Sequence, residues 1–198
     1  MKRNADHRWS RRTVVLHAAG ALTLMPLVAR AASVRSLYGA GRPALPGMGP
    51  SLRKTVAFDG VERPGTIVID VRKRALFLVT EANSALRYSI SVGRDGFGWN
   101  GRVTVGAKRE WPDWHPPAEM LARDPSLPRN VPPGPYNPLG ARALYLFRGG
   151  KDTLYRIHGT NHPGGVGADG TSGCFRLTNT DIVDLFNRVE IGTEVIVK

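Results

Sequence analysis

The sequence has a single cysteine, few aromatic residues and no long apolar run among its 198 residues. A lone cysteine excludes an internal disulfide and every zinc site built from several cysteines. No apolar segment reaches the roughly 18–20 residues that a membrane-spanning helix requires. Aromatic residues make up 8% of the chain and form no ladder with basic residues of the kind that binds nucleic acid. We therefore predict no transmembrane span in the mature chain, no nucleic-acid partner, and neither a metal nor another cofactor.

The amino-acid composition fits one globular domain that is rich in turns. Apolar residues are 41% of the chain, enough for one sizeable core, and the length suits a single domain. The 23 glycines and 15 prolines argue against an all-helical bundle, because both residue types destabilise helix interiors.

Residues 1–31 are typical of an export signal rather than of a folded element. A basic start is followed by the pair Arg11 and Arg12, by a moderately apolar stretch over 14–29, and by small residues around Ala31. This order indicates a twin-arginine signal with a cleavage site and predicts a periplasmic or cell-envelope protein. An uncleaved N-terminal anchor and a merely basic tail are the alternatives.

Removal of residues 1–31 lowers the positive charge of the chain. The formal net charge of +12 becomes +7, with 22 basic and 15 acidic residues remaining. These charges are scattered, so they fit either attraction to an anionic polymer such as the cell wall or a solvated surface without a partner. Glycine and proline dominate residues 32–50, and we assign 32–54 to a flexible leader ahead of a folded domain at 55–198.

Short β-branched and apolar segments separated by turns predict a mainly β domain. One helix is expected: Thr178 is a suitable N-cap, apolar residues recur at helical spacing from Ile182 to Val189, and Gly192 would end it. The fold class is therefore a β-sandwich-like mixed sheet with one short-to-medium α-helix. Strands are expected at 66–71, 75–79, 86–92, 103–105, 143–147, 153–157 and 194–197.

Residues 111–140 interrupt this pattern with nine prolines. Proline lacks the N–H that helices and sheets need, so the segment is expected to be a long insertion without regular structure. Loops of this length in a compact domain are usually functional or mobile. It is either such an insertion or a lid that covers a cleft.

The sole cysteine, Cys174, and His158 form the candidate catalytic pair. A lone thiol in an exported protein is open to oxidation, which favours a functional reason to keep it, although a buried structural cysteine is the alternative. His158 ends an apolar strand sixteen residues earlier, and the glycine-rich loop between them would allow the two to meet. An imidazole can take the thiol proton, and the resulting ion pair is a strong nucleophile.

The neighbours of this pair suit acyl transfer. Gly173 permits close approach of the backbone to a substrate, and the N–H groups of residues 172–174 could hold a developing oxyanion. Arg176 could grip a carboxylate with two parallel hydrogen bonds or lie on the surface. No acidic residue is an obvious partner for His158, so a backbone carbonyl, that of Gly159, is expected to orient the ring.

At these residues the chain resembles the L,D-transpeptidases of the YkuD type (the ErfK/YbiS/YcfS/YnhG group), which cross-link bacterial cell walls. The family motif is a His-Gly pair, a spacer, then Ser/Thr-His-Gly-Cys, an apolar residue and Arg or Asn. The motif positions present are His158, Gly159, Thr171, Gly173, Cys174, Phe175 and Arg176, and further matches lie at 111–117, 137–140 and 155–160. The resemblance covers roughly residues 64–198. It departs at Ser172, where the family has histidine, so this position cannot serve as a base.

The resemblance implies the L,D-transpeptidase catalytic fold and a two-step acyl transfer. Cys174 would be the nucleophile, His158 the base and acid, and Arg176 a positioner of substrate or oxyanion, with Gly173, Ser172, Thr171 and Gly159 around them. The substrate would be a peptidoglycan tetrapeptide stem, which loses its terminal D-alanine. The acceptor would be an amine on another stem or on a lipoprotein.

Three alternatives stay open at this point. Water as acceptor would make the protein an L,D-carboxypeptidase. A peptidoglycan-binding module without catalysis would explain export and charge but not the cysteine–histidine pair. A metal site of His158, His162 and Cys174 is disfavoured, because Gly159 and Pro163 oppose the helix that would align the two histidines.

Overall fold

The computed structural model describes residues 48–94 and 98–198, which form a strand-rich domain with one main helix. The mainly β class with a mixed sheet is confirmed. The predicted export signal and all but the end of the predicted leader lie outside the described residues, so both stay predictions. The elements are β1 (Lys54–Ala57), β2 (Ile67–Asp70), β3 (Ala75–Glu81), β4 (Ser84–Ser89), β5 (Val92–Gly93), β6 (Gly101–Glu110), α2 (Ala118–Arg123), β7 (Arg142–Arg148), β8 (Lys151–His158), the 3₁₀ turn η1 (Pro163–Gly165), β9 (Asp169–Thr171), β10 (Phe175–Arg176), α3 (Asn179–Arg188) and β11 (Glu194–Val197).

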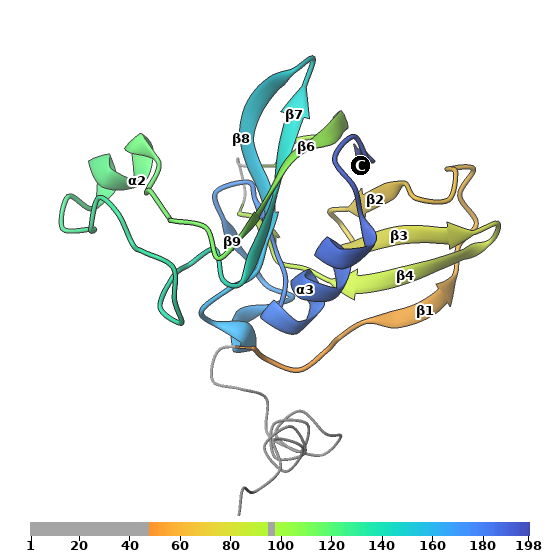
Figure 1. Cartoon of the computed structure of the whole chain (residues 1–198), viewed down its shortest axis with the longest axis horizontal. Coiled ribbons are helices and arrows are strands. Elements are labelled where there is room, and N and C mark those ends of the chain that lie inside the picture. The colour runs from red at the N-terminus through yellow and green to blue at the C-terminus, as the bar shows by residue number, and fades with distance from the viewer. Residues whose placement is uncertain (1–47, 95–97) are drawn as a thin grey trace, which may run out of the picture. The chain divides into compact units, whose positions relative to one another are not determined.

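Within the described residues, nine strands form one sheet in the order β1-β4-β3-β2-β11-β6-β7-β8-β10. Most neighbours are antiparallel, but β11 pairs in parallel with β2, and β10 pairs in parallel with β8. The strands β5 and β9 form a separate parallel pair. Figure 1 shows β6, β7 and β8 rising side by side, with α3 lying across the middle of the domain. The chain topology thus places the short strand β10 at one edge of the large sheet.

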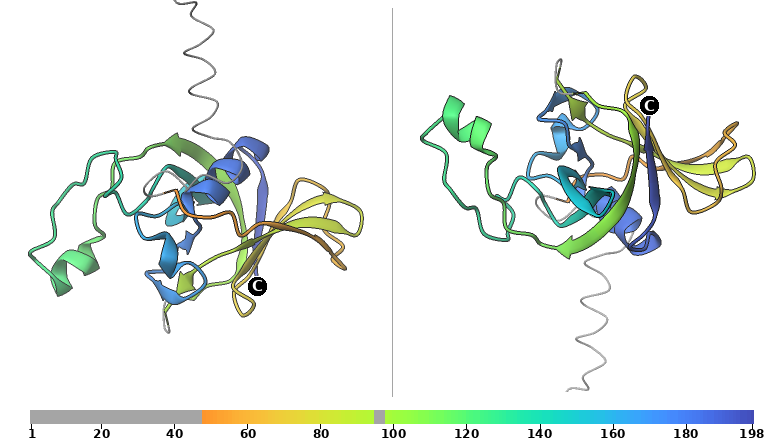
Figure 2. Two further views of the ribbon diagram at one scale, coloured as in Figure 1. Left: turned by 90° about the horizontal axis from the view of Figure 1, so that it is seen from below. Right: turned by 90° about the horizontal axis from the view of Figure 1, so that it is seen from above.

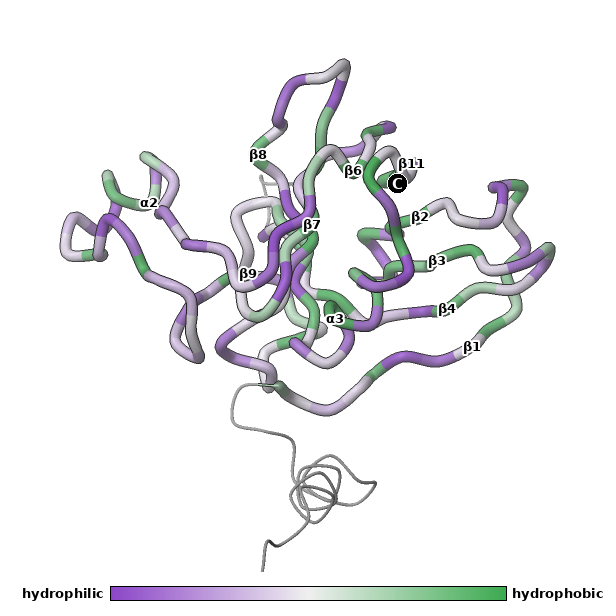
Figure 3. The backbone as a smooth tube through the Cα atoms, viewed as in Figure 1, coloured by the Kyte–Doolittle hydropathy of each residue, from purple (hydrophilic) through white to green (hydrophobic). Residues whose placement is uncertain are grey.

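The main core lies between the sheet and α3. Its buried side chains come from β2, β3, β4, β6, β7, β8 and β11 on one side and from the apolar face of α3 on the other. Figure 3 shows these apolar stretches along the strands and on α3. Thr178 caps the helix, since its Oγ1 accepts the N–H of Asp181 at 3.1 Å. Both the predicted cap and the predicted helix are confirmed.

The end of α3 differs from the prediction. The helix stops at Arg188, and Val189 leaves the helical conformation with φ −110° and ψ 147°. Gly192, with φ +95°, lies three residues further on, in the turn that leads into β11. Val189 is buried, which suggests that the chain leaves the helix there to keep this side chain in the core.

The predicted strands all correspond to observed ones, with boundaries shifted by a few residues. The strand β6 is much longer than predicted, because it extends from Gly101 to Glu110 and the prediction covered only 103–105. Sequence reasoning missed β1, β5, β9 and β10, which have two to four residues each. Strands of this length are too short to show a periodic pattern in the sequence. They are defined by pairing with neighbouring strands.

Residues 48–53 are bound to α3 by hydrogen bonds, although the sequence placed them in a flexible leader. The carboxylate of Asp181 accepts hydrogen bonds from Ser51 Oγ at 2.7 Å and from the Leu52 N–H at 2.9 Å. Thr180 donates its N–H to Met48 O and its hydroxyl to Gly49 O. The folded domain therefore begins by residue 48, and the last part of the predicted leader belongs to it.

The proline-rich segment 111–140 forms an extended arm, and hydrogen bonds connect its two ends. Asn137 is buried, and its Nδ2 donates to the carbonyls of Pro112, Val131 and Pro132. The short helix α2 lies at the far end and contains no buried residue. Figures 1 and 2 show α2 standing away from the sheet, so in this structure the arm does not fold over the domain as the predicted lid would.

The contacts of Asp181 predict the effect of removing its carboxylate. In Asp181→Ala, Ser51 and Leu52 lose their acceptor, and we expect a loss of about 1–3 kcal/mol in the free energy of unfolding. Trypsin should then cleave after Arg53 faster than in the wild type. The control Asp124→Ala removes a carboxylate that bonds only Ser126 in the arm. Equal cleavage rates in the two variants would contradict the docking of residues 48–53.

Candidate active site

The parallel pairing of β10 with β8 brings the predicted site residues together. Phe175 lies opposite Ile157, and Arg176 lies opposite His158. Side chains alternate between the two faces of a strand, so Cys174 and Arg176 share the face that carries His158. The ladder continues beyond the strand, since the Leu177 N–H donates to the His158 carbonyl at 2.8 Å. Extension of this register by one residue sets Cys174 opposite Arg156, two residues before His158 along β8.

The opposite face of the same two strands anchors them in the core. Phe175 and Ile157 are 2% and 0% exposed, and both belong to the main core cluster. Burial of these two side chains fixes which face of β10 carries the thiol. A slip of one residue in this pairing would turn the cysteine into the core.

A single backbone carbonyl orients the histidine. His158 Nδ1 lies 2.7 Å from Gly159 O, and because a carbonyl can only accept, Nδ1 carries the proton and Nε2 is left as an acceptor. This is the partner predicted from the sequence. Burial is the main cause that lowers the pKa of His158 to about 4, and the charges of Arg176 and Arg156 lower it further. The hydrogen bond to Gly159 opposes the shift, but the ring is neutral at pH 7.

The buried amide of Asn179 holds the backbone that follows the histidine. Its Oδ1 accepts from the N–H groups of Ala141 and Thr160 at 2.8 and 3.0 Å, and its Nδ2 donates to Thr160 O at 2.7 Å. A Cβ on Gly159 or on Gly140 would lie 2.1 Å from Oδ1. Both positions therefore require glycine. Sequence reasoning missed Asn179, because the first residue of a helix gives no sign of a contact outside the helix.

Cys174 as a residue is half-buried, and the pKa of its thiol is raised mainly by burial. The backbone N–H of Arg156 donates toward the sulfur, and this hydrogen bond acts in the opposite direction. A raised pKa for the thiol and a lowered pKa for His158 both favour the neutral forms. Both groups are therefore uncharged at neutral pH in the free protein.

The turn before Cys174 is fixed by two hydrogen bonds to its carbonyls. Thr171 Oγ1 donates to Cys174 O at 2.6 Å, and Trp99 Nε1 donates to Gly173 O at 3.2 Å. Gly173 has φ +98°, in the left-handed region that favours glycine. Ser172 in this turn is half-buried. Sequence reasoning placed Thr171 and Gly173 here but missed Trp99, which lies in a glycine-rich loop far away in the chain.

Arg176 is tied to a neighbouring loop. Its Nη2 donates to Gly165 O at 3.1 Å and to Ser91 Oγ at 3.3 Å, and Ser91 Oγ donates in turn to Gly165 O at 2.9 Å. The Nε of Arg176 is buried and has no hydrogen-bond partner among the described residues. The guanidinium therefore connects β10 to the loop around η1, on the face of the sheet that carries His158.

His162 lies in that loop, outside the pair formed by His158 and Cys174. Its N–H donates to Thr160 Oγ1 at 3.0 Å. Within residues 48–94 and 98–198, no three His, Cys, Asp or Glu side chains gather closely enough to hold a metal ion. No helix in the same part of the chain is long and apolar enough to cross a bilayer.

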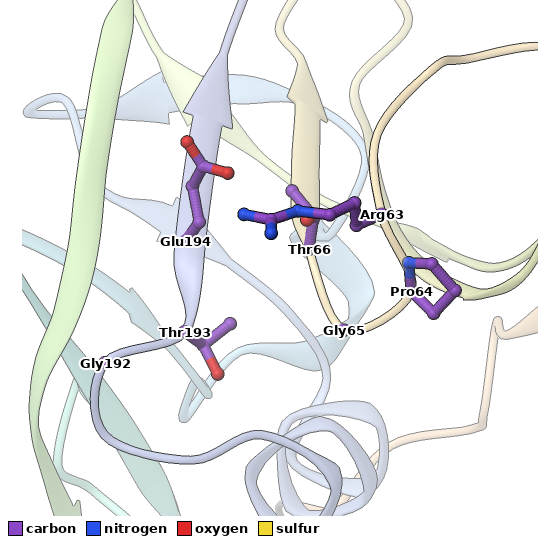
Figure 4. A pocket seen from close by; sticks show the side chains of 7 residues that line it. All are labelled: Arg63, Pro64, Gly65, Thr66, Gly192, Thr193 and Glu194. Atoms are coloured by element: carbon purple, nitrogen blue, oxygen red, sulfur yellow. The ribbon is translucent and has the colours of Figure 1, made fainter.

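A hollow elsewhere on the domain lies away from these residues. It is formed where β2 and β11 begin, and β6 and β7 separate those strands from β8. Figure 4 shows Arg63 and Glu194 on its two sides. Its lining residues are Arg63, Pro64, Gly65, Thr66, Gly192, Thr193 and Glu194. None of the predicted catalytic residues belongs to this hollow.

The sequence matches one protein family and several of its named members. The model of the YkuD family, described as an L,D-transpeptidase catalytic domain, matches residues 64–197. A probable L,D-transpeptidase ErfK/SrfK of Escherichia coli K12 is 38% identical over 139 residues, which are 67% of this chain and 43% of that protein. A putative L,D-transpeptidase of Fuscovulum blasticum is 34% identical over 70% of this chain and 71% of its own. The chain thus spans less than half the length of its Escherichia coli relative.

Solved structures show the same fold. A crystal structure from Brucella melitensis, described as a probable carnitine operon oxidoreductase, is 46% identical with a TM-score of 0.52, and the match covers 79% of this chain and 96% of that one. An L,D-transpeptidase of Enterococcus faecium is 18% identical with a TM-score of 0.52, over 69% and 50% of the two chains. At that identity the second similarity concerns the fold alone.

The lowered pKa of His158 predicts how stability depends on pH. Between about pH 4 and pH 6.5 the unfolded chain binds a proton at His158 that the folded protein excludes. The contribution of His158 to the free energy of unfolding is therefore complete above about pH 6.5 and is lost as the pH falls toward 4. We expect urea denaturation of the wild type to show a free energy of unfolding that falls over this range. His158→Asn should flatten the decline, whereas the control His162→Asn should retain it. An unchanged slope in His158→Asn would contradict a buried neutral imidazole.

Proposed function

The chain belongs to the YkuD family of L,D-transpeptidase catalytic domains, and from that premise we propose that it is a cysteine L,D-transpeptidase. Its substrates are peptidoglycan stem peptides, and it works in the periplasm or cell envelope after export by the signal at residues 1–31. The observation that carries the proposal is the register of β8 and β10, which pairs Arg176 with His158 just after Cys174. The family membership supports the reaction type, and this register supports the choice of Cys174 and His158.

In the first half-reaction, Cys174 Sγ attacks the carbonyl carbon of the third stem residue. A carbon–sulfur bond forms as the carbonyl opens to an oxyanion, and the thiol proton passes to Nε2 of His158. The tetrahedral species then collapses and breaks the bond to D-alanine, whose nitrogen takes the proton from His158. The products are a thioester on Cys174 and free D-alanine.

In the second half-reaction, an acceptor amine attacks the thioester carbonyl. The amine gives a proton to His158, a new amide bond forms, and the sulfur leaves and recovers its proton from the imidazole. An amine on another stem yields a cross-link, and an amine on a lipoprotein attaches that protein to the wall. Water in the same place yields carboxypeptidase activity.

The neutral resting pair suits proton transfer that accompanies the attack. The Nδ1–H of His158 is committed to Gly159 O, so only Nε2 is available to receive the thiol proton. Because burial disfavours both charged forms, the ion pair arises when the developing oxyanion is present to be stabilised. The backbone N–H groups of Gly173 and Cys174, with Ser172, are the donors that we assign to this oxyanion.

Arg176 contributes in two ways under this proposal. Its Nη2 keeps the loop around Gly165 in place, and its positive charge attracts the carboxylate of the departing D-alanine. Thr171 acts on the backbone instead, because its hydroxyl is occupied by the carbonyl of Cys174. A binding module without catalysis would need none of these contacts around the thiol.

The nucleophile is tested by Cys174→Ser. We expect D-alanine release from a purified tetrapeptide to fall by on the order of 10³-fold or more, because the hydroxyl is a far weaker nucleophile here. Mass spectrometry of the wild type should show the tripeptide thioester on Cys174, and the variant should lack it. Turnover by Cys174→Ser at the wild-type rate, or D-alanine release without the adduct in the wild type, would refute the assignment.

The acceptor is tested by the mass of the product. With tetrapeptide alone, a transpeptidase yields a dimer joined by a new amide, whereas a carboxypeptidase yields free tripeptide. We expect the dimer to predominate when a second stem with a free amine is in excess. Free tripeptide as the sole product with each amine offered would assign the carboxypeptidase reaction. Binding of Cys174→Ser to isolated cell wall should persist, which separates substrate binding from catalysis.

A further inference from the structure

Trp99 contacts the turn that carries Cys174 from a distant part of the chain. Its Nε1–H donates to Gly173 O at 3.2 Å across 74 residues of sequence. The carbonyl that it holds belongs to the peptide bond between Gly173 and Cys174. The indole is thus bonded to the peptide group that supplies the N–H of Cys174.

The ring of Trp99 is itself clamped. It stacks on Tyr155 of β8, with ring centroids 4.8 Å apart and an interplanar angle of 17°, and it packs at 5.8 Å against Phe175 of β10. The guanidinium of Arg148, from β7, lies over the ring with its carbon 5.8 Å from the centroid. Contacts with three neighbouring strands leave the indole little freedom, so its N–H has a fixed direction.

Peptide planarity transmits this direction to Cys174. In a trans peptide the C=O of Gly173 and the N–H of Cys174 point in opposite directions. Because Gly173 O points at Trp99, the Cys174 N–H points away from the indole. The bond from Thr171 to Cys174 O fixes the next carbonyl as well. Among the described residues, the Cys174 N–H itself has no hydrogen-bond partner.

We propose that Trp99 is a positioning residue that aims the Cys174 N–H at the oxyanion. This inference rests on the proposed acyl transfer, in which that N–H is a donor. Trp99 touches neither substrate nor thiol, and it acts through the Gly173–Cys174 peptide. This role requires two features of the side chain, which are the packing of the ring and the indole N–H.

The test variant is Trp99→Phe, which keeps an aromatic ring against Tyr155 and removes the N–H. The probes are p-nitrophenyl acetate, whose attack by the thiol creates an oxyanion, and iodoacetamide, whose attack creates none. We expect acylation by p-nitrophenyl acetate to slow by about tenfold, a fraction of the 10²–10³ that follows deletion of a donor. Alkylation by iodoacetamide should stay within about twofold of the wild type, because thiol ionisation is unaltered.

The tetrapeptide reaction provides a second measurement. Trp99→Phe should lower kcat with little change in KM, since the N–H acts on the transition state. The control Trp111→Phe makes the same chemical change at an exposed indole, and it should leave all three rates unchanged. If the wild type reacts with p-nitrophenyl acetate but not with tetrapeptide, the proposed function fails while the role of Trp99 is still measured.

Two outcomes would overturn the positioning role. Equal acylation rates in Trp99→Phe and the wild type would show that the N–H does not matter. An equal loss in alkylation and acylation would show a general disturbance of the thiol. If Trp99→Phe fails to fold, hydrogen exchange of the Trp99 indole N–H in the wild-type protein tests the bond instead. We expect slow exchange, and exchange as fast as a free indole would refute the bond.

Discussion

The parallel pairing of β10 with β8 is the contact on which the rest of the site depends. It involves two residues of β10, and it sets Arg176 opposite His158. Burial of Phe175 and Ile157 on the far face stabilises this register, because each side chain moved into water would cost about 1.5–3 kcal/mol. The arginine and the histidine are thereby placed by the hydrophobic core beneath them.

Polar side chains at the start of α3 stabilise both sides of this arrangement. Asn179 binds the backbone that follows His158, while Asp181 binds the segment 51–52 ahead of β1. Both side chains are buried, so each of these hydrogen bonds satisfies a group that would otherwise be costly to remove from water. One helix terminus therefore connects the beginning of the domain to the loop behind the histidine.

Burial also sets the electrostatics of the site. Desolvation lowers the pKa of His158 and raises the pKa of the Cys174 thiol, so both groups are neutral at pH 7. A site of this kind gains its charges only when the substrate carbonyl begins to react, so a fixed set of backbone donors is more valuable than a preformed ion pair. The cost of burying the thiol and the imidazole cannot be read from the sequence, because the fold decides how deeply each group is buried.

The amino-acid sequence by itself determined the elements with a strong local pattern. These include the apolar strands, the helix capped by Thr178, and the carbonyl partner of His158, which is adjacent in the chain. The tertiary structure alone decided the short strand β10, the docking of residues 48–53, the extended arm and the contacts of Trp99 and Asn179. Those features depend on hydrogen bonds and ring contacts between residues far apart in sequence, and no local propensity or spacing encodes such contacts.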